Sequence, residues 1–395
     1  MTPDNLFATP PEDAQPEHHI RSLRELIDIV SGRSIKDQIP QEDAGYAEVL
    51  PYPFLALVGQ IEMKLALCLT IINPAIGGVL LVGPRGTGKT TAVRSLLDLL
   101  PDIQRSTCFY GCLEEDINTG GMDAICPDCA KKFAEGLPLT ASDRVRLIEL
   151  PLNASLEDVV GGIDERAALH DRFRLKRGVL AHADLNLLYL DEVNLLDDQI
   201  IDAILDASAS GSYTVRRGPI SAYYRSRFSL IGSLNPEEGK LRPQIMDRFG
   251  LRVVVKGLNE SEDRLEAYRR VRAYHQNPRL AIQFYAQESQ QAAQEIAVAR
   301  QVLDQVQLPD EIAHLGITLI QKMKVDSLRA EITLFEAARA LAAADNRLQV
   351  TVDDIRQVAP MALRLRRSTF IAQYLSEQAE EEAEIVQLIK SSLLA

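Results

Sequence analysis

Short apolar runs alternate with helical patterns over the first two thirds of the chain. The segment IEMKLALCLTII (61–72) has apolar residues at helical spacing, and TTAVRSLLDLLP (90–101) repeats that spacing before it stops at a proline. Four short apolar runs bounded by turn or polar residues lie at 78–83, 146–150, 187–192 and 228–235. Strands that alternate with helices indicate a parallel sheet covered on both faces, so this part is predicted to be an α/β domain.

The strand signal stops near residue 262, and only helical patterns follow. They cover residues 261–275, 286–306, 310–324, 332–346, 351–366 and 370–393. We therefore predict an all-helical domain after the α/β domain. At the other end, residues 1–47 are mostly polar and are predicted to form a largely flexible tail, with one short helix over 18–32.

The composition narrows the class of protein. The chain has 395 residues, 46% of them hydrophobic, and a formal net charge of −13. An acidic excess argues against a dedicated nucleic-acid-binding protein, which needs surplus Lys and Arg. No apolar run approaches the roughly 20 residues of a membrane helix, and the acidic, proline-rich N-terminus does not resemble a secretory signal. We expect a cytoplasmic protein that binds no nucleic acid and does not insert into a membrane.

The segment GPRGTGKT (83–90) fits the phosphate-loop pattern and lies between a predicted strand and a predicted helix. Its glycines let backbone N–H groups turn toward an anion, and the N-terminus of the following helix favours the same charge. Lys89 can reach the β- and γ-phosphates, and the Thr90 hydroxyl can ligate Mg²⁺. The candidate phosphate-binding residues are Gly83, Pro84, Arg85, Gly86, Thr87, Gly88, Lys89, Thr90 and Thr91.

Polar residues end two of the later strands, where ligands bind in open α/β sheets. Asp191 and Glu192 follow the run LLYL, so Asp191 can complete the Mg²⁺ shell and Glu192 can polarise the attacking water. Asn235 ends the next strand and can orient that water, although it also suits the start of the turn NPEEG. The alternative interpretation is that Asp191 and Glu192 are simply two acids in an ordinary turn. The upstream phosphate loop disfavours this alternative.

Two arginines extend this series, although either alone would be read as an ordinary surface residue. Arg248 follows Asp247, and Arg329 lies just before a predicted helix of the second domain. The resulting order of motifs resembles the AAA+ ATPases. Within that class, longer segments resemble the ATPase subunits I of magnesium chelatase, from about residue 50 to about 366. These segments are FLALVGQ (54–60), GGVLLVGPRGTGKTTAVRSL (77–96), LLYLDEVNLLDDQIIDAILDASASG (187–211), GSLNPEEGKLRPQIMDRFGL (232–251) and LRAEITLFEAARALAA (328–343).

The resemblance implies a role for each candidate residue, and ATP and Mg²⁺ as cofactors. The roles would be Walker A (Lys89, Thr90), Walker B (Asp191, Glu192), sensor 1 (Asn235), arginine finger toward the neighbouring subunit (Arg248), sensor 2 of the same subunit (Arg329) and adenine pocket (Val58, Gly59, Gln60).

The resemblance also implies a domain plan. Its parts would be the AAA+ nucleotide-binding domain (48–262), connecting helices (263–308) and a helical lid domain with a C-terminal helix (309–395). A hairpin would occupy 212–228, and a helix-2 insertion would occupy 163–182.

The family's activity is ATP hydrolysis in a hexameric ring that works with subunits D and H. Together they insert Mg²⁺ into protoporphyrin IX, a step of chlorophyll or bacteriochlorophyll synthesis. Two alternatives share the nucleotide site: a MoxR-like AAA+ chaperone, or a cobaltochelatase ATPase subunit, that matures another metal-containing target. A third is an assembly factor that binds ATP and turns over slowly.

Four of the five cysteines form a cluster with the spacing C-x₃-C-x₁₃-C-x₂-C, in an insert at about 108–135. Cys108, Cys112, Cys126 and Cys129 therefore form two close pairs separated by a loop, as tetrahedral zinc ligation requires. This set is a departure from the plant and purple-bacterial members of the family. A structural Zn²⁺ site is our first interpretation. A redox-responsive dithiol, unligated thiols and an iron–sulfur cluster are the alternatives, and none of them makes the cysteines catalytic.

Overall fold

The computed structural model describes residues 50–108, 111–163, 175–218, 220–239 and 241–366. Apart from Leu50, these residues belong to one compact unit, Pro51–Ala395. The predicted tail at 1–47, the predicted helix at 370–393 and much of the predicted insertion at 163–182 lie outside the described residues. Among the helices that are described, none is long and apolar enough to cross a bilayer.

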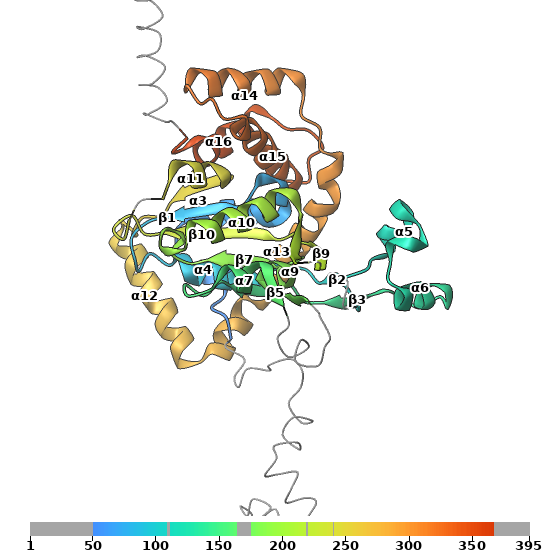
Figure 1. Ribbon diagram of the computed structural model, residues 1–395. Helices are drawn as coiled ribbons and strands as arrows, with labels where there is room; N and C mark the ends of the chain where they lie inside the picture. The colour runs from blue at the N-terminus through green and yellow to red at the C-terminus, as the bar shows by residue number, and fades with distance from the viewer. Residues whose placement is uncertain (1–49, 109–110, 164–174, 219, 240, 367–395) are drawn as a thin grey trace, which may run out of the picture. The chain divides into compact units, whose positions relative to one another are not determined.

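A five-stranded sheet lies at the centre of the α/β part, with the strand order β11-β1-β10-β7-β4. Every neighbouring pair in it is parallel. Figure 1 shows β1, β10 and β7 between helices on both sides. The predicted α/β fold with a parallel sheet is therefore confirmed. The strands are β1 (Val79–Val82), β4 (Leu147–Glu149), β7 (Leu187–Leu190), β10 (Ser229–Leu234) and β11 (Leu251–Val254).

The two faces of this sheet bury alternate residues of the same strand. In β1, Val79 and Leu81 belong to one apolar core, and Leu80 and Val82 belong to the other. Because both faces are covered, such strands read as uninterrupted apolar runs in the sequence. The first face is covered by α3 (Ile61–Ile72) and α4 (Lys89–Ser95), and the second by α7 (Leu156–Val160), α9 (Val179–His182), α10 (Asp198–Ser210) and α11 (Pro243–Arg248).

Three antiparallel ribbons lie outside the main sheet in the described part of the chain. They are β2–β3 (Ile103–Ser106, Thr140–Asp143), β5–β6 (Gly161–Ile163, Leu175–Arg177) and β8–β9 (Ser212–Arg217, Ile220–Arg225). The last of these is the hairpin expected at 212–228. The sequence pattern does not predict the other two ribbons. The strands of β2–β3 are largely polar and half exposed, and β5–β6 begins with two buried glycines and contains Lys176 and Arg177. Between β2 and β3 lies an insert with α5 (Glu114–Gly120) and α6 (Pro127–Ala134).

Helices form the rest of the described chain, as the pattern predicts. Their bounds are α12 (Ser261–Gln276), α13 (Pro278–Val302), α14 (Asp310–Lys322), α15 (Leu328–Ala344) and α16 (Val352–Leu363). The start of α13 was predicted at 286 and is wrong by two turns. Pro278 occupies the first turn, and Asn277 caps the helix by accepting a hydrogen bond from the Leu280 N–H at 3.1 Å.

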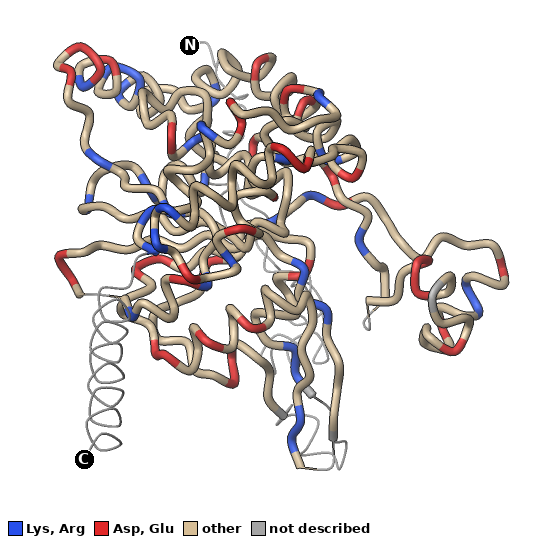
Figure 2. The backbone as a smooth tube through the Cα atoms, turned by 90° about the horizontal axis from the view of Figure 1, so that it is seen from above, with Lys and Arg blue, Asp and Glu red and all other residues tan. Residues whose placement is uncertain are grey.

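Charged residues of both signs are interspersed along the described backbone (Figure 2). Many ion pairs are exposed, such as that between Arg356 and Asp353, whose side chains are 75% and 72% exposed. Exposed pairs of this kind contribute little to stability. A buried cluster around Asp247 is different, and it connects α11 to the C-terminal helical part.

The Asp247 carboxylate accepts hydrogen bonds from Arg366 at 2.6 Å, from Arg252 at 3.3 Å and from the Ser327 hydroxyl at 2.8 Å. Both arginine side chains are fully buried. Arg366 also donates to the carbonyl of Gly250 at 2.9 Å. One carboxylate therefore offsets the charge of two guanidinium groups that are out of contact with water.

Burial on its own would raise the pKa of Asp247. The hydrogen bond from Ser327 and the positive charges of Arg366 and Arg252 outweigh burial, and the pKa is lowered. A lowered pKa means that folding favours the ionised carboxylate. Its contribution to stability is present above the unfolded-state pKa, near 4, and is lost as the pH falls through the folded-state pKa.

We predict that Asp247→Asn lowers the free energy of unfolding by about 3 kcal/mol, because two buried cations lose their counter-charge. Urea unfolding followed by circular dichroism measures this. The matched control is Asp353→Asn, which removes an exposed ion pair and is expected to cost less than about 0.5 kcal/mol. Equal losses in the two variants would contradict the role given to Asp247.

Candidate active site

The segment 83–90 connects β1 to α4 and forms an open backbone loop. Gly86 and Gly88 have φ angles of +76° and +84°, and no described atom outside the adjoining residues lies within 4 Å of the position that a Cβ would take. At Gly83, a Cβ would lie 2.2 Å from the carbonyl oxygen of Val255, so only glycine fits beside the end of β11. The loop therefore has the exposed peptide groups that phosphate binding requires.

Lys89 supplies the cation of this loop. The residue is only 8% exposed, and its Nζ donates to the carbonyls of Gly83 at 2.6 Å and Pro84 at 2.8 Å. Burial lowers the pKa of Lys89, while the negative charges of Asp191 and Glu192 act in the opposite direction. The ammonium group is thus held against the loop, beside the acids that follow β7.

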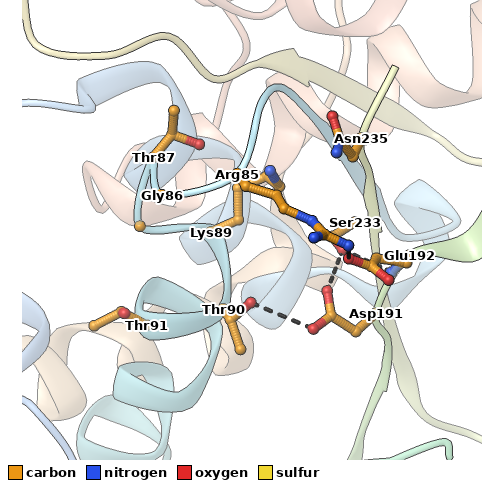
Figure 3. Close-up of a pocket in the computed structure, with 11 residues that line it drawn as sticks. Arg85, Gly86, Thr87, Lys89, Thr90, Thr91, Asp191, Glu192, Ser233 and Asn235 are labelled. Carbon is orange, nitrogen blue, oxygen red and sulfur yellow. Dashed lines mark hydrogen bonds and ion pairs between the residues drawn. The ribbon is translucent and has the colours of Figure 1, made fainter. Parts of the chain in front are cut away.

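Asp191 is fixed by hydroxyl groups from three elements. Its carboxylate accepts hydrogen bonds from Tyr189 at 2.8 Å and from Ser233 at 2.5 Å, and it lies 3.5 Å from the Thr90 hydroxyl (Figure 3). Burial raises the pKa of Tyr189, so its hydroxyl stays protonated and donates to Asp191. The structure therefore brings together Thr90 and Asp191, the two residues predicted to hold Mg²⁺.

Glu192 has a backbone conformation that is rare for a residue with a side chain, with φ 53° and ψ 55°. Its N–H donates to the Ser233 hydroxyl at 3.0 Å. Its carboxylate lies 3.2 Å from the Arg85 guanidinium (Figure 3). The same guanidinium also pairs with Glu238. Such strained positions cluster at functional sites. Here the turn places a carboxylate directly over the phosphate loop.

These residues surround a cavity of about 290 Å³. Its lining consists of Arg85, Gly86, Thr87, Gly88, Lys89, Thr90, Thr91, Asp191, Glu192, Ser233 and Asn235. The three carboxylates at or beside this cavity, of Asp191, Glu192 and Glu238, face two cations, Lys89 and Arg85. The carboxylates can hold a divalent cation, and the two cationic side chains can bind the phosphates of a polyphosphate.

A second cavity of about 490 Å³ adjoins the first and shares four residues with it, three of the phosphate loop and Thr91 of α4. Apolar side chains supply much of its wall, including Tyr52, Leu57, Met63, Ala267 and Val271. Two of the predicted adenine-pocket residues, Val58 and Gln60, line it. The third, Gly59, does not. It packs against Leu258, which does line the cavity.

Asn235 lies beside the acids, as predicted for sensor 1, and is 3% exposed. Its side-chain oxygen accepts a hydrogen bond from the Glu237 N–H at 3.3 Å. The residue therefore begins a turn and lines the cavity at the same time, so the two interpretations of Asn235 are compatible.

The two predicted arginines lie elsewhere in this chain. Arg248 ends α11, and its guanidinium lies 2.9 Å from Asp206 and 3.1 Å from Asp202, both on α10. Arg329 is exposed near the start of α15. Among the described residues, neither arginine lines the two cavities. Their roles toward a nucleotide stay predictions.

Sequence reasoning missed three residues of the site: Ser233, Tyr189 and Glu238. Ser233 lies two positions before Asn235, and Tyr189 two positions before Asp191, so strand alternation places each pair on one side of its strand. That alternation could have identified both. Glu238 lies in the turn after β10 and carried no local signal, because its partner Arg85 is distant in the sequence.

Comparison with known proteins places the chain in a family. A magnesium-chelatase subunit ChlI homolog of Methanocaldococcus jannaschii is 40% identical over 334 residues, which cover 84% of this chain and 90% of the relative. The chain belongs to the magnesium chelatase subunit I family. A second member, the magnesium-chelatase 38 kDa subunit of Acidiphilium rubrum, is 42% identical over 319 residues, or 80% of this chain and 90% of the relative.

Two further findings concern the fold. The AAA lid domain family matches residues 316–389, a range that begins in α14 and contains α15 and α16. A solved structure of a Cytophaga hutchinsonii protein has a TM-score of 0.52 at 19% identity and covers 86% of this chain and 91% of that one. At that identity the likeness is one of fold.

We predict that Ser233→Ala lowers kcat for ATP hydrolysis about 10- to 100-fold, because Asp191 and the Glu192 backbone lose the hydroxyl that joins them. Nucleotide affinity should change much less, since Ser233 is not part of the phosphate loop. Steady-state ATPase assays and binding of a fluorescent ATP analogue measure the two quantities.

The matched control is Ser229→Ala, in the same strand but at its other end. This variant should stay within about twofold of the wild type. Similar kcat values for all three proteins would show that Ser233 does not position the acids.

Proposed function

We propose that this protein hydrolyses ATP as the motor subunit of a magnesium chelatase, in a ring that works with subunits D and H. The observation that carries the hydrolytic part is the convergence of the phosphate loop, Asp191, Glu192 and Asn235 on one cavity. The family membership supports the assignment to chelation. The predicted cytoplasmic location stays a prediction.

The residues divide the work of hydrolysis as follows. The loop N–H groups and Lys89 bind the phosphates, and Thr90 and Asp191 hold Mg²⁺, which withdraws charge from the phosphate oxygens when bound. Glu192 orients the attacking water and accepts its proton. Ser233 fixes the position of both acids, so that their carboxylates need not reorganise during the reaction.

Arg248 is assigned to the neighbouring subunit of the ring. In its own chain it lies outside the nucleotide cavities and is held by Asp206 and Asp202, whose side chains are 72% and 49% exposed. Weak surface pairing leaves the guanidinium available to a γ-phosphate bound by the next protomer. A hexameric ring would complete each site in this way. Arg329 would contact the nucleotide of its own subunit after a movement of the lid.

ATP and Mg²⁺ are the cofactors that this function requires. The four cysteines are not needed for hydrolysis, and a zinc ion on them is a separate proposal. Insertion of Mg²⁺ into protoporphyrin IX would take place on the partner subunits, and this chain would supply the mechanical work.

Reconstitution tests the function. Mixed with subunits D and H, protoporphyrin IX, Mg²⁺ and ATP, the chain should support formation of Mg-protoporphyrin, followed by fluorescence. Glu192→Gln should bind ATP yet lose at least about 100-fold in hydrolysis, and metallation should fall with it.

The control for this experiment is Glu237→Gln, which changes an exposed carboxylate two residues from Asn235. It should behave as the wild type. Failure of the wild-type chain to support metallation, where an authentic subunit I succeeds, would leave an ATPase that serves another target.

Mixing two inactive variants tests the shared site. Lys89→Ala should lose nucleotide binding, and Arg248→Ala should lose turnover. Rings assembled from equal amounts of both should regain turnover, up to about a quarter of that of the wild type, because one random junction in four pairs an intact loop with an intact arginine. No recovery, with mixed rings confirmed by differential labelling, would contradict the assignment of Arg248.

A further inference from the structure

The insert between β2 and β3 has little apolar core of its own. In the described residues, its buried apolar cluster consists of Cys112, Ile125, Cys129 and Leu139. Two of these four residues are cysteines. A segment of this length with two short helices cannot be held by so small a core, and natural domains of such size use a metal or disulfides instead.

The four cysteines of the insert meet at one point. Their Sγ atoms all lie within 4.8 Å of one another, and all four are free thiols. Four thiolates around Zn²⁺ at about 2.3 Å from the metal lie about 3.8 Å apart. The cluster is therefore close to the dimensions of a zinc site. A disulfide would bring one pair of sulfurs to about 2 Å and leave the other two cysteines unpaired. An iron–sulfur cluster would need larger sulfur–sulfur distances, because its cysteine sulfurs bind different iron atoms.

Backbone N–H groups already point at two of these sulfurs. The Cys112 N–H donates to the Cys108 Sγ at 3.3 Å, and the Cys126 N–H donates to the Cys112 Sγ at 3.3 Å. Ser106 fixes the same turn, because its hydroxyl accepts from the Cys108 N–H and donates to the Cys112 carbonyl. Such donors stabilise thiolates that bind a metal. They also set the directions of the sulfur atoms.

We propose that Cys108, Cys112, Cys126 and Cys129 bind one structural Zn²⁺, and that the metal-bound insert braces the hairpin β8–β9. The site is closed, since all four ligands come from the protein and Cys112 and Cys129 are buried. It is separate from catalysis, because none of the described cysteines lines either nucleotide cavity.

Arg225 of β9 makes the connection between the insert and the hairpin. It donates to the Gly111 carbonyl at 2.9 Å and forms an ion pair with Asp116. The Asp116 carboxylate also accepts the Leu113 N–H at 2.8 Å and so caps the start of α5. Gly111 and Leu113 flank the ligand Cys112. A metal that orders this turn therefore orders the acceptors that hold Arg225.

Metal analysis tests the site in the full-length protein. Purified without chelators, the chain should carry one zinc ion, and the double variant Cys126→Ser, Cys129→Ser should carry almost none. The matched control is Cys68→Ala, which removes the remaining cysteine, outside the insert in α3, and should keep full zinc. Replacement of zinc by Co²⁺ should give the absorption of a tetrahedral cobalt thiolate in the wild type and in Cys68→Ala only.

Retained ATP binding in the double variant would show that the α/β core still folds, so that loss of zinc reports on the ligands. Three results would overturn the zinc site: wild-type protein without metal, wild-type protein with iron and inorganic sulfide, or zinc that persists in the double variant. None of these bears on the proposed hydrolysis of ATP, which uses other residues.

Hydrogen exchange tests the brace. Amides of 212–217 and 220–225 should exchange faster after zinc is removed, and faster in Arg225→Gln with zinc in place. Arg216→Gln, which changes an exposed arginine of the same hairpin, should exchange as the wild type. Unchanged exchange in the zinc-free protein and in Arg225→Gln would show that the insert does not support the hairpin.

Discussion

The parallel pairing of β10 between β1 and β7 is the constraint on which this active site depends. Its register sets Val82 opposite Leu234 and Leu190 opposite Gly232, so three polar segments emerge at one edge of the sheet. A slip of one residue in β10 would turn Ser233 and Asn235 to the opposite face. The apolar residues that alternate with them, buried on both faces, prevent that slip.

Much of the fold could be predicted from local pattern, because β1 and β7 are short, largely apolar runs and the segments that contain β4 and β10 are rich in Leu and Ile. The fifth, β11, was missed. Arg252 interrupts the apolar run of β11. The strand pairs with β1, and Arg252 donates a hydrogen bond to the Arg364 carbonyl, and both partners are remote in the sequence. The ribbons β2–β3 and β5–β6 were missed for a related reason. Each of their strands is stabilised by pairing with another strand. The pattern of apolar and polar residues within one strand does not reveal that pairing.

The residues of the candidate site also divide into those that a local sequence pattern reveals and those that only contacts between distant segments reveal. The phosphate loop and the pair Asp191 and Glu192 are contiguous in the sequence, so their chemistry was predictable from their own spacing. Ser233 became visible only once β10 was known to lie next to β7. The role proposed for Arg248 would depend on contacts between protomers, which one chain does not contain. The cysteines were recognisable by spacing, but their connection to Arg225 required the hairpin and the insert to be seen together.

Asp247 and Arg248 share one peptide bond, and this adjacency has a mechanical consequence. Asp247 is hydrogen-bonded to Arg366 and Ser327, which belong to the helical part, while Arg248 pairs with Asp202 and Asp206 of α10. Any tilt of the helical part that follows nucleotide exchange would pull on Asp247 and shift the next side chain with it. In the proposed ring, the nucleotide bound by one subunit would then influence the position of the arginine that serves the adjacent site.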